Sequence, residues 1–229
     1  RGDASAEAID LYLRARAQVR LWEFGGEQGA AALFERCLAL APTLQPAISG
    51  LAIAAVRGWF SPREEGRDWA ALAAEAVERA RVEAPDLAGT HLAIGMLAVH
   101  RGDYAEAARA LAQAIRIAPT YAAAHDYLGR LQLEAGQPEL GMRHLELAIA
   151  LWLLRARLGQ YRPERAMCSI HSSTAALLVR SKWTFPAAIS RSAVTAALFF
   201  EWTRGAPPFI SWRVRRAART TSAKRFSSR

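Results

Sequence analysis

The sequence of 229 residues is poor in three residue types: it has no asparagine, two lysines and two cysteines. The cysteines, Cys37 and Cys168, are far apart in the chain. Two such residues provide neither a disulfide framework nor a zinc site. Cys37 falls where a small core residue is needed, so we predict a buried thiol there. Unpaired cysteines fit a reducing compartment, and we expect a cytoplasmic location.

Long apolar runs are also missing. No stretch of about 18 residues is both apolar and free of charge, which argues against a transmembrane helix. The best candidate, residues 183–200, is interrupted by Pro186 and Arg191. The start of the chain leads directly into an amphipathic pattern and does not resemble a signal peptide. Because the first residue is not Met, we expect a fragment or a processed piece of a longer protein.

The sequence lacks the short motifs of common active sites. It contains no GxGxxG, no GxxxxGK[ST], no HExxH, no CxxC and no GxSxG. These patterns place phosphates, metals or nucleophiles, so their absence removes the usual sequence signals of catalysis. We therefore predict that the chain is not an enzyme and has no catalytic residue, cofactor or metal.

Charge divides the chain into two parts. Residues 1–150 carry a net charge of −4, whereas residues 151–229 carry +13 with Glu164 and Glu201 as their only acids. Serine rises from three in the first part to ten in the second. The overall charge of +9 therefore describes neither part, and we place a boundary near residue 150.

A repeated pattern occupies the first part. The segments CLALAP, ARVEAP and AIRIAP end at Pro42, Pro85 and Pro119, and each has the form of a helix end followed by a residue that cannot continue the helix. The last two prolines are 34 residues apart. The first two are 43 apart, which requires a nine-residue insertion, and the polar segment 60–68 has that length.

These positions resemble the tetratricopeptide repeat. In residues 88–121 the matching residues are Ile94, Gly95, Gly102, Ala107, Leu111, Ala114 and Pro119. In the next copy they are Leu128, Gly129, Gly136, Gly141, Leu145 and Ala148. The resemblance implies an all-α, right-handed superhelix of three to four helix pairs over residues 5–152. The approximate repeats are 5–44, 45–87, 88–121 and 122–152.

The segment from Ala8 to Pro42 resembles repeat arrays of large bacterial signalling proteins. In those proteins the array follows a Ser/Thr kinase, an adenylate cyclase or a DNA-binding effector domain. The resemblance implies that this chain is the C-terminal docking or sensor half of such a protein. A catalytic domain would then lie upstream of Arg1.

The resemblance also implies a concave groove lined by the first helix of each repeat. The expected lining residues are Ile53, Arg57, Leu92, Met96, Val99, His100, Asp126, Arg130, Leu133 and Glu134. Such a groove binds an extended peptide or a helix, so we predict a non-catalytic protein–protein interaction scaffold. The apolar members would supply affinity, and Arg130 with Asp126 would set register. The alternative is that this face packs on a neighbouring domain of the parent protein.

One kind of partner is disfavoured, because its usual binding clamp cannot form in this chain. Repeat domains of this family that hold the C-terminal carboxylates of chaperones use Asn and Lys side chains. This chain has no Asn, and Lys182 and Lys224 lie outside the repeats.

Two histidines, His91 and His125, share one position of successive repeats. A metal site would need further ligands at that point, so we predict that both are partly buried helix residues without a metal. Asp103 is expected to cap a helix.

The basic tail, residues 153–229, breaks the pattern within a repeat, because Leu153 stands where the closing proline is expected. Three interpretations are open: a nucleic-acid- or membrane-binding tail, a loosely ordered extension, or a shifted reading frame in a GC-rich gene. The abrupt break favours the third. Nucleic-acid binding is not favoured, because Trp183, Trp202 and Trp212 stand among basic residues without a recognisable binding motif.

Overall fold

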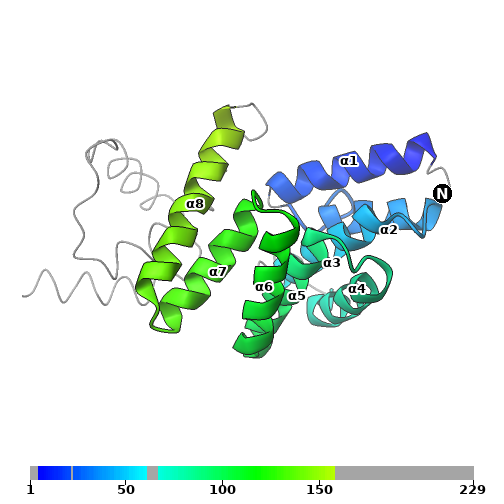
Figure 1. Ribbon diagram of the computed structural model, residues 1–229. Coiled ribbons are helices and arrows are strands. Elements are labelled where there is room, and N and C mark those ends of the chain that lie inside the picture. Colours follow the sequence, from blue (N-terminus) through cyan, green and yellow to red (C-terminus); the bar gives the residue numbers. More distant parts are fainter. Residues whose placement is uncertain (1–4, 22, 61–66, 158–229) are drawn as a thin grey trace, which may run out of the picture. The chain divides into compact units, whose positions relative to one another are not determined.

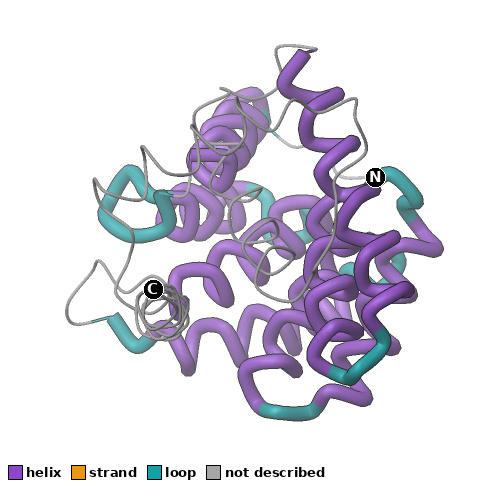
Figure 2. Tube along the Cα trace, turned by 90° about the vertical axis from the view of Figure 1, so that its left-hand side faces the viewer, coloured by secondary structure: helices purple, strands orange, loops and turns teal. Residues whose placement is uncertain are grey.

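The computed structural model describes residues 5–21, 23–60 and 67–157, and within these ranges every regular element is an α-helix (Figures 1 and 2). The helices are α1 (Ala6–Leu21), α2 (Ala30–Leu40), α3 (Gln45–Phe60), α4 (Trp69–Glu83), α5 (Ala88–Arg101), α6 (Tyr104–Ile117), α7 (Ala122–Glu134) and α8 (Pro138–Arg157). The predicted all-α class is confirmed. The predicted tail begins inside α8, so residues 153–157 are helical; residues 158–229 lie outside the described residues.

The helices form four hairpins, α1 with α2, α3 with α4, α5 with α6 and α7 with α8. The first helices of the hairpins also contact one another in order, α1 with α3, α3 with α5 and α5 with α7. Each hairpin therefore packs mainly on its neighbours in the sequence. In such an array, stability is approximately a sum of hairpin terms and nearest-neighbour terms.

Three turns join consecutive hairpins, and all have the same form. They are residues 41–44, 84–87 and 118–121, and each starts with Ala-Pro. The alanines have φ of −136°, −137° and −134°, outside the helical region. A residue before proline is pushed out of the helical conformation, so the proline ends each helix at the same place. The last residue of each turn donates its N–H to the alanine carbonyl, at 3.1, 3.4 and 3.0 Å.

Two aspartate side chains and a glycine define three further helix ends. The Asp103 carboxylate accepts a hydrogen bond from the N–H of Glu106 at 2.9 Å, which confirms the predicted cap of α6. Asp68 caps α4 in the same way through the N–H of Ala71. Gly102 ends α5 with φ of +77°, a conformation that disfavours residues with a Cβ.

Small residues allow the two helices of a hairpin to approach closely. A Cβ added to Gly129 on α7 would lie 2.8 Å from the carbonyl oxygen of Gly141 on α8. A Cβ added to Gly95 on α5 would lie 2.7 Å from Cγ of Leu111, a fully buried side chain of α6. The buried Cys37 thiol donates to the carbonyl of Ala8, and burial raises its pKa, as expected for a core cysteine.

Candidate partner-binding surface

The ten predicted groove residues lie on α3, α5 and α7, the helices that contact one another in sequence order. Five of them are buried, namely Ile53, Leu92, Met96, Asp126 and Leu133. Leu92 and Met96 are 0% exposed, so in this structure they pack in the interior and do not line an open groove. Their helix, α5, is in contact with α3 and α7 on either side, and such packing removes the central positions from solvent.

The other five predicted residues retain access to solvent. Arg57, Val99, His100 and Arg130 are half-buried, and Glu134 is exposed. They lie toward the C-terminal ends of their helices, Arg57 on α3, Val99 and His100 on α5, and Arg130 and Glu134 on α7. A role for these residues in binding stays a prediction.

An aromatic cluster joins the C-terminal ends of α3 and α5; we define it as Trp59, Phe60 and His100. The His100 ring stacks on Trp59 with centroids 4.6 Å apart, and the Phe60 ring lies 3.4 Å from it. Burial lowers the pKa of His100, which favours the neutral imidazole. Phe60 is 50% exposed and presents an apolar ring to solvent. The predicted set contained His100 but missed both aromatic residues, although they follow Arg57 closely in the sequence.

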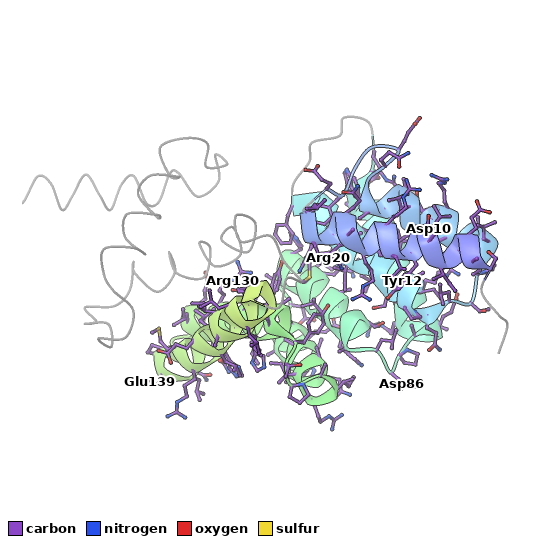
Figure 3. All side chains as sticks on the ribbon, turned by 90° about the horizontal axis from the view of Figure 1, so that it is seen from above. Asp10, Tyr12, Arg20, Asp86, Arg130 and Glu139 are labelled. Carbon is purple, nitrogen blue, oxygen red and sulfur yellow. The ribbon has the colours of Figure 1, made fainter. Side chains whose placement is uncertain are left out.

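Asp126 and Arg130 form an ion pair within α7, with Nη2 and Oδ2 2.7 Å apart (Arg130 is labelled in Figure 3). Burial opposes the charged form of Arg130, but Asp126, Tyr127 and Glu134 outweigh burial and raise its pKa. The guanidinium also lies 4.6 Å from the centre of the Tyr127 ring. Because the Asp126 carboxylate is buried and already paired with Arg130, Arg130 is the more accessible member of this predicted pair.

His91 and His125 make the same contact in successive hairpins. Nε2 of His91 lies 2.8 Å from the carbonyl oxygen of Pro85, and Nε2 of His125 lies 2.9 Å from that of Pro119. Nδ1 of His125 lies 2.8 Å from Nδ1 of His144 on α8, a partner that the sequence patterns did not indicate. Within the described ranges, no group of three or more His, Cys, Asp or Glu side chains is arranged to hold a metal ion.

Comparison with known proteins places the fold. No family model matches the sequence, and no curated protein matches it. Among solved structures, a thermophilic TPR protein of Thermus thermophilus is similar, with a TM-score of 0.50 and 22% identity over 76% of this chain and 82% of that chain. Structures of MamA are similar to a lesser degree, for example with a TM-score of 0.41 and 16% identity over 74% of this chain and 97% of that chain.

The array of helix hairpins thus has the fold of tetratricopeptide-repeat proteins. The resemblance found in the sequence is confirmed at the level of the fold. The likeness to arrays of kinases and cyclases is not tested by these neighbours. Among the described residues, no helix is both long and apolar enough to cross a membrane.

Proposed function

We propose that this chain is a non-catalytic scaffold that binds a peptide or a helix of a partner protein along α3, α5 and α7. The observation that carries the proposal is the aromatic cluster, which bridges two neighbouring hairpins and leaves Phe60 half exposed. An exposed aromatic ring at a helix end offers a partner an apolar contact area.

The charged residues nearby would add selectivity. Arg57 precedes the cluster on α3, and Arg130 lies on α7 at the corresponding end. A partner with an apolar side chain for Phe60 and an acidic side chain for Arg130 would match this surface. Long-range attraction between unlike charges raises association rates more than it raises affinity.

The test uses peptides selected from a random displayed library against the full chain. We expect Phe60→Ala to weaken binding of the selected peptides by roughly tenfold, because truncation of an interface aromatic typically costs more than about 1 kcal/mol. Val82→Ala is the control, since Val82 is a 70% exposed apolar residue on α4, which is not a helix of the proposed surface. Loss of binding in Val82→Ala with none in Phe60→Ala would refute this location.

Two further interpretations from the sequence stay predictions. A role as the regulatory part of a bacterial Ser/Thr kinase or adenylate cyclase depends on sequence upstream of Arg1. Binding of nucleic acid would depend on residues 158–229, outside the described part of the chain. The alternative that the proposed surface packs on a neighbouring domain of the parent protein also stays a prediction.

A further inference from the structure

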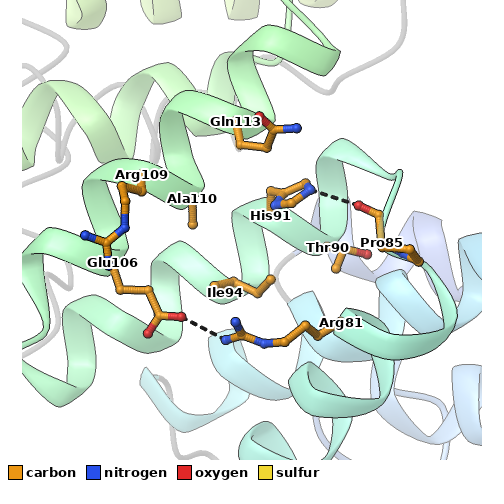
Figure 4. A pocket seen from close by; sticks show the side chains of 9 residues that line it. All are labelled: Arg81, Pro85, Thr90, His91, Ile94, Glu106, Arg109, Ala110 and Gln113. Atoms are coloured by element: carbon orange, nitrogen blue, oxygen red, sulfur yellow. Dashed lines mark hydrogen bonds and ion pairs between the residues drawn. The ribbon is translucent and has the colours of Figure 1, made fainter.

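A second candidate site lies on another face of α5. A cavity of about 420 Å³ opens between α4, α5 and α6, with Arg81, His91, Ile94, Arg109, Ala110 and Gln113 in its lining (Figure 4). Positions 91 and 94 are separated from the predicted groove positions 92, 96, 99 and 100 by about 80° or more around the helix axis. The cavity is therefore distinct from the proposed partner-binding surface.

The floor of the cavity is apolar and its wall is polar. Ile94 and Ala110 are 6% and 7% exposed and form the floor. On one side, Arg81 on α4 pairs with Glu106 on α6 at 2.8 Å, so these two charges neutralise each other (Figure 4). Arg109 is exposed and makes no ion pair within the described ranges, which leaves the wall with one unneutralised positive charge.

His91 supplies a hydrogen-bond acceptor to this cavity. A carbonyl oxygen can only accept, so the contact of Nε2 with the Pro85 oxygen fixes the proton of the neutral ring on Nε2. Nδ1 then carries a lone pair. In the lining, the hydroxyl of Thr90 is also buried and has no hydrogen-bond partner among the described residues.

The next hairpin shows which kind of group binds the equivalent Nδ1 acceptor. His125 is the equivalent of His91, and its Nε2 makes the same contact with a prolyl carbonyl. Its Nδ1 is occupied by Nδ1 of His144, at 2.8 Å. His144 lies 34 residues after Ala110, so the alanine leaves open the place that an N–H-bearing side chain fills one repeat later.

We propose that this cavity binds an acidic segment of a polypeptide, with a backbone N–H donated to Nδ1 of His91 and a side-chain carboxylate held by Arg109. The amide of Gln113 adds a donor to the carboxylate, and Ile94 and Ala110 contact its aliphatic stem. A free N-acylated acidic amino acid presents the same two groups and is the other source of this chemistry. The site is independent of the aromatic cluster, so failure of either proposal leaves the other standing.

The experiment follows the methyl resonance of Ile94 in the full chain during titration with acetyl-Ala-Glu-Ala-amide. We expect a saturable shift at roughly millimolar peptide, as befits one exposed charge pair and a few contacts. The neutral analogue with Gln in place of Glu should bind about fivefold more weakly. N-acetylglutamate separates the two sources: a shift at lower concentration than the tripeptide indicates a small molecule, and the reverse order indicates a polypeptide.

Two variants and one control locate the site. Arg109→Gln should weaken binding of the tripeptide about fivefold, whereas Arg116→Gln, an exposed arginine of the same helix outside the lining, should not. Ala110→His should place an imidazole against His91, fill the cavity and abolish binding while helical circular dichroism is retained. No shift of the Ile94 methyl, or equal binding by wild type, Arg109→Gln and Ala110→His, would overturn the proposal.

Discussion

The close contact between α7 and α8 gives a prediction whose size follows from the structure. Gly129→Ala would place a methyl carbon 2.8 Å from the Gly141 carbonyl oxygen and 2.9 Å from Cγ of Leu145. The first is backbone and the second belongs to a fully buried side chain, so neither moves without separating the helices. Overpacking costs about 1–3 kcal/mol, while alanine gains about 1 kcal/mol over glycine in helix propensity. Because neither contact can relax freely, the cost lies in the upper part of that range, about 2–3 kcal/mol, and we expect a net destabilisation of about 1–2 kcal/mol.

Hydrogen exchange of the full chain measures this change locally. Since each hairpin packs mainly on its neighbours, the loss should be concentrated in α7 and α8, with amides there exchanging roughly 5–30-fold faster. In the unsubstituted chain, residues 122–150 should already be the least protected part of the array. Exposed leucines on α8, including Leu140 and Leu147, are consistent with a terminal hairpin that lacks a following repeat among the described residues.

A control variant isolates the contribution of helix propensity. Ala112→Gly, at an exposed position of α6, measures the propensity term alone and should cost about 0.5–1 kcal/mol. Unchanged or slower exchange in α7 and α8 of Gly129→Ala would refute the reasoning about the contact. Equal acceleration in α1 to α4 would instead refute the nearest-neighbour description.

Three further predictions concern stability in urea unfolding. Burial and the neighbouring His125 lower the pKa of His144, so the unfolded chain binds a proton at this residue more readily than the folded chain. The free energy of unfolding should therefore fall as the pH drops below about 6.5. In His144→Ala, the decrease in the free energy of unfolding between about pH 7.5 and pH 5 should be smaller. Asp103→Ala removes the cap of α6 and should lower the free energy of unfolding by about 1 kcal/mol, with no loss contradicting the cap. Leu111→Ala, at a fully buried position, should lower the free energy of unfolding by about 2–5 kcal/mol. A decrease below about 1 kcal/mol would show that the helices move together and fill the space left by the leucine side chain.

The helix ends were predictable from the sequence because they depend on local chemistry. Proline and the residue before it end three helices, and Asp103 starts another, wherever the rest of the chain lies. The pairing of helices was predictable for a related reason: Gly95 and Gly129 mark close approaches that larger residues would prevent.

The candidate sites were less predictable, because they depend on how far neighbouring helices overlap. The resemblance to the tetratricopeptide repeat assigned Leu92 and Met96 to the groove face of α5 but could not show that they are fully buried. The cavity depends on the small side chain of Ala110, and a small residue gives no chemical signal in a sequence. His144 lies at a position without a repeat signature, so its contact with His125 required the three-dimensional structure.

The uniform four-residue turns between hairpins have a consequence for how this array can vary. Every step from one described hairpin to the next is made by an Ala-Pro turn of four residues, with closely similar alanine φ angles. The connections inside the hairpins differ in length, with eight residues between α1 and α2 and between α3 and α4, two between α5 and α6, and three between α7 and α8. Changes of length are thus confined to one edge of the array, where they leave the spacing of α1, α3, α5 and α7 untouched. The connections inside the hairpins can therefore change in length, while the turns between hairpins keep the interval between successive first helices constant.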